Sequence, residues 1–188
     1  MIEWFQSMTL WDWFVQAIGI VAAILGIASF QRKTQQGIVL FQLAGNVMWT
    51  LHFLLLGAAA GGLLNGIAIL RGVVFYFRSE RKWAASPAWY AVFIAMFAGA
   101  AAFSWGQGDG ALALLPLGGM IFTTVSLALR NAFLVRVVSF GSSPCWLIYN
   151  IINFSIPGIL TEIFAMCSIV IGIVRIDLPK MRRKGEKA

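Results

Sequence analysis

Charged residues are scarce in this chain of 188 residues: they make up 11% of it, while 60% is hydrophobic. Soluble domains carry about 25% charged residues, so this composition excludes a soluble globular fold. The chain has only 5 Pro and 2 Cys, and its 19 Gly follow no triplet period, which excludes disordered, collagen-like and disulfide-stapled classes. The composition that remains is typical of an all-α polytopic membrane protein embedded in a lipid bilayer.

Enzyme and cofactor signatures are also missing. The sequence contains no G-x-S-x-G, H-E-x-x-H or P-loop motif and no cluster of Cys and His. We therefore predict no enzymatic activity, no catalytic residue, no cofactor and no metal. The net charge of +7 would suggest nucleic acid in a soluble chain. Here the basic residues gather between apolar stretches, and we predict no nucleic-acid partner.

Long apolar stretches fill most of the chain. Seven can be marked, each close to the ~20 residues that cross a bilayer as a helix. Their approximate bounds are 12–30, 36–56, 57–77, 86–106, 110–129, 134–154 and 156–175. Too little sequence remains for a soluble domain, so we predict that residues 1–188 form a single membrane domain with seven transmembrane helices.

The basic residues lie almost entirely on one side of these stretches. Thirteen of the 14 follow the first, third, fifth and seventh stretch, and Arg71 is the exception. The connections on the other side carry acidic residues or no charge. Because basic loops stay in the cytoplasm, we predict a multi-pass protein of the bacterial inner membrane. Its N-terminus would lie outside, and its basic tail, residues 176–188, in the cytoplasm.

The sequence also repeats internally. Moving the chain by 97 residues aligns the first three stretches with the last three without a gap, although chance similarity between apolar helices is a competing explanation. The matched pairs include Trp49 with Trp146, Gly61 with Gly158 and Arg78 with Arg175. One stretch separates the two triplets, so both would have the same orientation, as in transporters built from parallel repeats. The predicted division is a three-helix bundle over 12–78, a linker helix over 86–106 and a second three-helix bundle over 110–175.

Three segments carry a resemblance to known families: FQRKTQQ, WTLHFLLLG with LLNGIAILRG, and CWLIYNIINFSIPGILTEIF. In these segments the chain resembles the YgjV-like bacterial inner-membrane protein family. Its organisation is similar to that of the SWEET, SemiSWEET and PQ-loop group and to the seven-span PnuC-type carriers. The Pro-Gln dipeptide of the PQ-loop group is absent, since Pro116 is followed by Leu117. The resemblance therefore implies the 3+1+3 plan more directly than a proline-hinged motion or a sugar substrate.

The same resemblance implies a substrate pocket. In SWEET-type carriers a Trp on the second helix and an Asn on the third line the pocket of each bundle. Trp49 and Asn65 match these positions in the first bundle, and Trp146 and Glu162 match them in the second, with Glu in place of Asn. SemiSWEET proteins often place a Tyr one turn beyond the Trp as an outer gate, where this chain has His52 and Tyr149.

Each candidate also has a purely structural interpretation. Glu162 is either a ligand for a cation or proton, or a carboxyl satisfied by a neighbouring helix. Asn65 either lines the pocket or holds helices together, and the two Trp either line the pocket or fill the core. Asn150 and Asn153 follow Trp146 by four and seven residues and share its helix face. For the gate, His52 is either a packing residue or a proton partner of Glu162, and Arg71 either snorkels to the cytoplasmic surface or contacts an anion at an inner gate.

These observations predict a carrier that moves a small polar solute by alternating access. The predicted binding residues are Trp49, Asn65, Trp146, Glu162, Asn150 and Asn153, and the predicted gate residues are His52, Tyr149 and Arg71. Glu162 favours a cationic or amine-bearing solute, or proton coupling. The alternative is a non-transporting membrane protein that binds a partner, as an assembly factor or sensor. Its small residues would then serve helix association, and homo-oligomerisation is left open.

Overall fold

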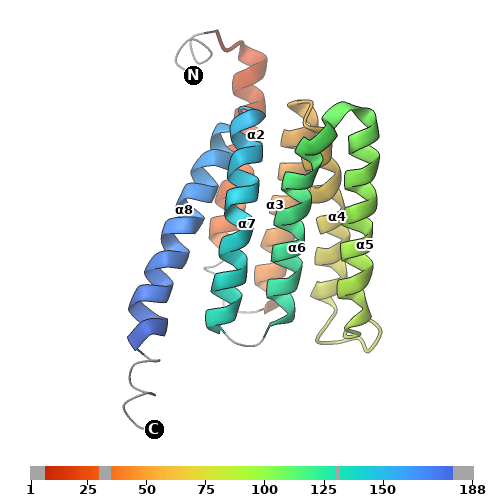
Figure 1. Ribbon diagram of the computed structural model, residues 1–188, viewed down its shortest axis with the longest axis vertical. Helices are drawn as coiled ribbons and strands as arrows, with labels where there is room; N and C mark the ends of the chain where they lie inside the picture. Colours follow the sequence, from red (N-terminus) through yellow and green to blue (C-terminus); the bar gives the residue numbers. More distant parts are fainter. Residues whose placement is uncertain (1–6, 30–34, 130–131, 180–188) are drawn as a thin grey trace.

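The computed structural model describes residues 7–29, 35–129 and 132–179, which form helices and turns and no strand. Figure 1 shows the helices as a bundle of roughly parallel and antiparallel rods. Each helix boundary lies within four residues of the boundary expected from the sequence. The helices are α2 (Leu10–Ser29), α3 (Gln35–Leu55), α4 (Ala59–Tyr76), α5 (Ala88–Ser104), α6 (Leu114–Ala128), α7 (Ala132–Ile152) and α8 (Ile156–Gly172).

Several of these helices are suited to a membrane by length and composition. Within the described ranges, four stretches are long and apolar enough to cross a bilayer: Leu10–Ser29, Ala59–Tyr76, Ala88–Ala128 and Ile156–Arg175. Val39–Leu55 is apolar but shorter. The 41-residue stretch Ala88–Ala128 contains both α5 and α6. It reverses direction at Gly108 and Gly110, whose φ angles of 116° and 54° suit glycine, so α5 and α6 lie antiparallel.

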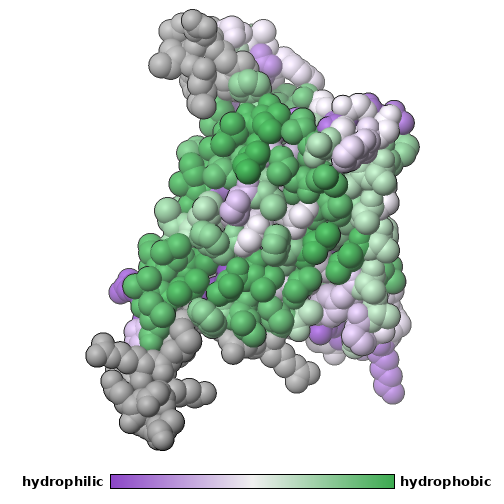
Figure 2. Space-filling view, in the orientation of Figure 1, coloured by the Kyte–Doolittle hydropathy of each residue, from purple (hydrophilic) through white to green (hydrophobic). Residues whose placement is uncertain are grey.

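The outer surface is apolar, as lipid contact requires. Figure 2 shows a broad hydrophobic band over the visible face, with hydrophilic residues gathered toward the two ends. On α8, Leu160 and Phe164 are 62% and 63% exposed. Exposure of such large apolar side chains is unfavourable in water but not against lipid tails. The chain is therefore an all-helical polytopic membrane protein. That each of the seven helices crosses the bilayer stays a prediction.

Six of the seven described helices form two layers of three. In the first half, α3 lies between α2 and α4, and in the second half α7 lies between α6 and α8. The halves meet where α2 packs on α8 and α4 packs on α6. In Figure 1 the second half lies in front of the first, and α5 lies at the edge, packed on α4 and α6. This arrangement encloses the side chains of α3 and α7 between the layers.

The helix ends of the two halves match at the offset of 97 residues. Both ends of α3 lie 97 residues before the corresponding ends of α7, and α4 begins 97 residues before α8. The α3–α4 and α7–α8 turns also match, because Gly57 and Phe154 both have positive φ, 76° and 54°. Each turn closes with the backbone hydrogen bond of a Schellman motif. The matched bonds are Ala58 N–H to Phe53 O at 2.8 Å and Ser155 N–H to Asn150 O at 2.9 Å.

Candidate functional site

A cavity of about 210 Å³ lies between the two halves. This is room for a small solute rather than for one or two waters. Its wall is formed by side chains of α3, α4, α6, α7 and α8, and most of them are polar although the surrounding bundle is apolar. The polar lining residues are Asn46, Asn65, Arg71, Thr123, Ser142, Asn150, Thr161 and Glu162.

Five of the six predicted binding residues line this cavity, as does the predicted gate residue Arg71. The five are Trp49, Asn65, Trp146, Glu162 and Asn150. Asn153 is not among the lining residues, and its amide donates to Tyr149 O at 2.9 Å, one turn back in its own helix. The structure thus brings together residues from positions 49 to 162, and their role in binding stays a prediction.

A row of aromatic rings crosses from one half to the other. The Phe53 ring stacks between Trp49 and Trp146, with centroid separations of 5.7 Å on both sides and interplanar angles of 24° and 27°. Phe53 is 2% exposed. Phe53 was not among the predicted binding residues, although it follows Trp49 by four residues and so lies on the same helix face. The row holds both indoles as flat walls of the cavity.

Asn65 and Glu162, which are 97 residues apart, present polar groups from α4 and α8. The Asn65 amide donates to Gly61 O at 2.9 Å in its own helix, and its Oδ1 has no hydrogen-bond partner among the described residues. Glu162 lies near the Ser143 hydroxyl of α7. Asn150, 2% exposed, has a buried Oδ1 that receives no hydrogen bond from the described part of the chain. The wall around Glu162 therefore holds more acceptors than donors.

His52 lies outside the cavity lining, and its ring contacts that of Trp49, with centroids 5.5 Å apart. Its Nδ1 lies 2.9 Å from Val15 O, and its Nε2 lies 2.7 Å from Ser155 Oγ. Because a carbonyl oxygen only accepts, Nδ1 carries the proton and Nε2 accepts from the Ser155 hydroxyl. Ser155 Oγ in turn accepts from Gly158 N–H at 3.2 Å as the N-cap of α8. Both ring nitrogens are thus engaged by Val15 and Ser155, and neither is bonded to Glu162.

Tyr149, the counterpart of His52 at the same offset of 97, makes the reciprocal contact. Its phenol oxygen accepts a hydrogen bond of 2.8 Å from the N–H of Gly61, in the first turn of α4. We call the pair of contacts, His52 with Ser155 and Tyr149 with Gly61, the crossed latch. Each ties one half to the start of the last helix of the other. Both side chains are almost completely buried, and their role as a gate stays a prediction.

Arg71 lies deeper along α4, beyond Asn65. Its side chain is 8% exposed, its Nη1 donates to Thr124 Oγ1 of α6 at 2.7 Å, and its guanidinium carbon lies 5.5 Å from the centroid of the Phe97 ring of α5. The side chain therefore stays within the bundle and does not snorkel to the helix end. This contact is a second tie between the halves.

The cavity lining offers groups that can bind a small molecule. Glu162 is the one carboxylate in its lining. Within the described residues, no group of three or more His, Cys, Asp or Glu side chains is placed to hold a metal ion. The arrangement can hold a small molecule through charge, amide hydrogen bonds and flat aromatic faces.

Comparisons with known proteins agree with a membrane assignment. The family Imp-YgjV, described as "Bacterial inner membrane protein", matches residues 13–180. The chain is similar to the inner membrane protein YgjV of Escherichia coli (strain K12), with 28% identity over 153 residues, which cover 80% of this chain and 77% of that protein. No solved structure matches the chain.

Proposed function

This chain belongs to the Imp-YgjV family of bacterial inner membrane proteins, and we propose that it carries a small polar solute across that membrane by alternating access. One observation carries the proposal: a polar cavity lies between two similar three-helix halves. Trp49 and Asn65 line it from one half, and Trp146 and Glu162 from the other. Ionisable and amide groups at such depth are costly, and they usually mark a substrate or ion pathway.

The architecture that suits this function is two parallel three-helix bundles joined by a linker helix. The first half (α2, α3, α4) and the second half (α6, α7, α8) would be the bundles, and α5 the linker. The shared register of helix ends and the matching turns at Gly57 and Phe154 support this division. A single linker crossing gives both bundles the same orientation, and transporters of this design bind solute at the interface between repeats.

The positions of the two ties between the halves support alternating access. Along α4, the order is Gly61 at the crossed latch, Asn65 at the cavity and Arg71 at its contact with Thr124. Each tie joins the first half to the second, one on either side of the cavity. Opening one tie while the other holds would expose the cavity to one side of the membrane at a time. Pro144 in the interior of α7 removes a helix hydrogen bond and offers a place to bend.

Cysteine labelling tests the proposal without knowledge of the solute. Asn65→Cys would be introduced into a chain carrying Cys145→Ala and Cys167→Ala and treated with a small, membrane-impermeant thiol reagent. A carrier predicts labelling both from outside in intact cells and from the cytoplasmic side in inverted vesicles. The matched control is Leu64→Cys, because Leu64 adjoins Asn65 in α4 but is fully buried in the apolar core.

Two results would contradict the carrier. Labelling of Asn65→Cys from one side only, or from neither, would show that the cavity does not alternate between the two faces. Equal labelling of Leu64→Cys would mean that the reagent reports loosening of the bundle rather than access to the cavity. A cavity closed to both sides, in a chain that purifies with a stoichiometric protein partner, would favour the partner-binding alternative.

A further inference from the structure

Two ionisable side chains of opposite type, the buried Arg71 and the half-buried Glu162, face the cavity from different halves of the molecule. Arg71 reaches it from α4, and Glu162 reaches it from α8. No ion pair joins either side chain to another group in the described ranges. A charge away from water is unfavourable unless it is paired, so each group would be stabilised by a ligand group of opposite charge in the space between them.

Arg71 lacks an anion. Its guanidinium has five N–H donors, and one of its nitrogens is bonded to the neutral Thr124 hydroxyl. That hydroxyl donates its own proton to Met120 O at 2.7 Å, so it turns a lone pair toward Arg71 and holds the guanidinium in place. The donors that remain form a planar fork that matches a carboxylate.

The opposite wall lacks donors. Glu162 has the Ser143 hydroxyl nearby, and a carboxylate can accept about four hydrogen bonds. Asn150 nearby holds a buried Oδ1 without a donor from the described residues. The indole of Trp146 also lines this wall, and an aromatic face attracts a cation. These groups together suit an ammonium group.

The helix register sets the separation between the two charged groups. Arg71 follows Asn65 by six residues, about 9 Å along α4 at 1.5 Å per residue, and Asn65 is the counterpart of Glu162 at the offset of 97. Helical side chains lean toward the N-terminus of their helix, so the Arg71 side chain extends back toward the level of Asn65. The span that remains suits a short chain of a few carbon atoms, which the cavity volume of about 210 Å³ also accommodates.

We infer that the cavity binds a small zwitterion, with its carboxylate on Arg71 and its ammonium group beside Glu162. A solute with one charge would leave the opposite charge unmet, whereas a zwitterion satisfies both and adds no net charge to the site. The inference rests on the proposed function, because it names the class of solute that the same cavity carries.

Ligand-dependent thermal unfolding of the full chain, purified in detergent at pH 7, tests the inference. The probes are the zwitterions β-alanine and γ-aminobutyrate, with propionate, butyrate, propylamine and butylamine as single-charge controls of matched length. At least one zwitterion should bind about tenfold more tightly than its two matched controls, since each loses one charge-assisted hydrogen-bonding group.

Two variants test which protein group binds each end of the ligand. Glu162→Gln keeps the size of the side chain and removes its charge, so the zwitterion should lose its advantage over the matched carboxylate. Arg71→Lys keeps the charge but not the bidentate fork, so zwitterion affinity should fall about tenfold while the preference over the matched amine remains. We choose Arg71→Lys over the neutral Arg71→Gln because a retained positive charge is the smaller disturbance to folding.

Several outcomes overturn the inference. The inference fails if neither zwitterion binds more tightly than both of its matched controls. It also fails if the preference for the zwitterion is unchanged in Glu162→Gln. If neither zwitterion binds but Asn65→Cys is labelled from both sides, the zwitterion inference fails and the carrier stands. If Asn65→Cys is labelled from neither side, the carrier itself fails, and a zwitterion that still binds then occupies a static site.

Discussion

His52 and Tyr149 occupy equivalent places in the two halves but contact the starts of α8 and α4 in different ways. The first residues of a helix have backbone N–H groups without partners in the helix. Before α8, Ser155 caps the helix with its own hydroxyl, and His52 binds that hydroxyl. Before α4, Ala58 has no side-chain acceptor. Tyr149 therefore accepts from Gly61 N–H, and Asp109 accepts from Ala60 N–H at 2.8 Å.

This difference predicts the effect of Tyr149→Phe. The substitution removes the acceptor of a buried N–H group and should lower the free energy of unfolding in detergent by about 1–2 kcal/mol. Tyr76→Phe is the matched control, because the Tyr76 hydroxyl has no hydrogen-bond partner among the described residues. It should change stability by less than about 0.5 kcal/mol. Equal losses in the two variants would show that the latch bond to Gly61 adds nothing.

At the scale of the helices, the cavity wall depends on a close approach of α6 and α7. A Cβ atom at Gly119 of α6 would lie 2.3 Å from Trp146 Nε1 and 2.5 Å from Cδ1. The indole stacks on Phe53, so it cannot swing aside without breaking the aromatic row. Gly119 thus allows the large Trp146 side chain to reach the interface between the halves.

Gly119→Ala should therefore destabilise the protein by about 1–3 kcal/mol through overpacking. Gly99→Ala in α5 is the control, since a Cβ there would meet no atom within 4 Å. It should be neutral or stabilise by about 0.5–1 kcal/mol, because alanine favours a helix. Thermal unfolding of both variants measures the contrast. If Gly119→Ala were as stable as Gly99→Ala, the close packing of Trp146 against α6 would not constrain the fold.

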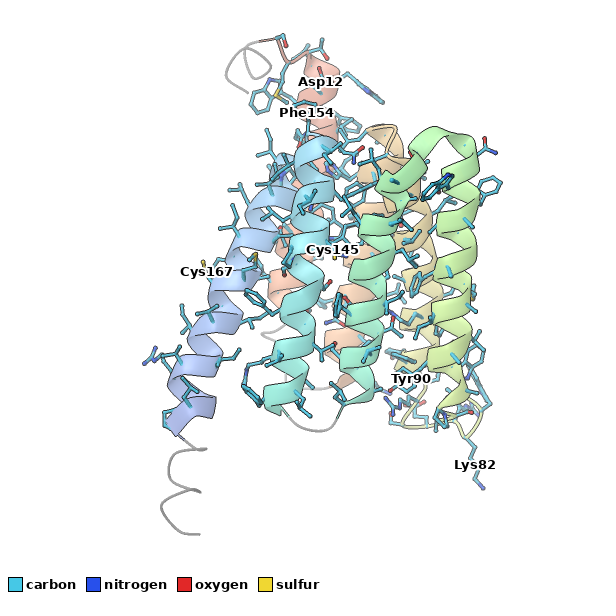
Figure 3. All side chains as sticks on the ribbon, in the orientation of Figure 1. Asp12, Lys82, Tyr90, Cys145, Phe154 and Cys167 are labelled. Atoms are coloured by element: carbon cyan, nitrogen blue, oxygen red, sulfur yellow. The ribbon has the colours of Figure 1, made fainter. Side chains whose placement is uncertain are left out.

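At the scale of the whole molecule, charge divides the two ends. Figure 3 places Asp12 and Phe154 at one end of the bundle and Lys82 and Tyr90 at the other. The turn after α5, which contains Gln107, lies at the same end as the start of α2, and the connection after α4, which contains Ser79, lies at the opposite end. Basic loops are retained in the cytoplasm, so the end with Lys82 should face it.

Orientation can be measured with two single cysteines in the chain that lacks Cys145 and Cys167. Gln107→Cys should react with an impermeant thiol reagent in intact cells, and Ser79→Cys should react only in inverted vesicles. Both positions are exposed in the structure, so a failure to react reports sidedness rather than burial. The reverse pattern would place the N-terminus in the cytoplasm and contradict the charge rule for this chain.

The sequence alone determined the features that depend on local patterns. Apolar runs close to the bilayer thickness predicted the helices, and the breaks between them predicted the helix ends. The offset of 97 residues placed Trp49 and Asn65 at positions equivalent to Trp146 and Glu162, and all four line the cavity. Periodicity along one helix determines which side chains share a face, so these expectations needed no knowledge of how the helices pack.

Only the tertiary structure decided which partners those faces meet. In the structure Phe53 stacks between the two indoles, and the Asn153 amide bonds to its own helix. Both nitrogens of His52 are bonded, one to Val15 and one to Ser155. Arg71 stays inside the bundle, where it donates to Thr124. Most of these contacts join helices many residues apart, and a side chain such as that of Arg71 can reach either a helix end or a neighbouring helix. Which one it reaches depends on the distance and crossing of the helices, which no single stretch of sequence encodes.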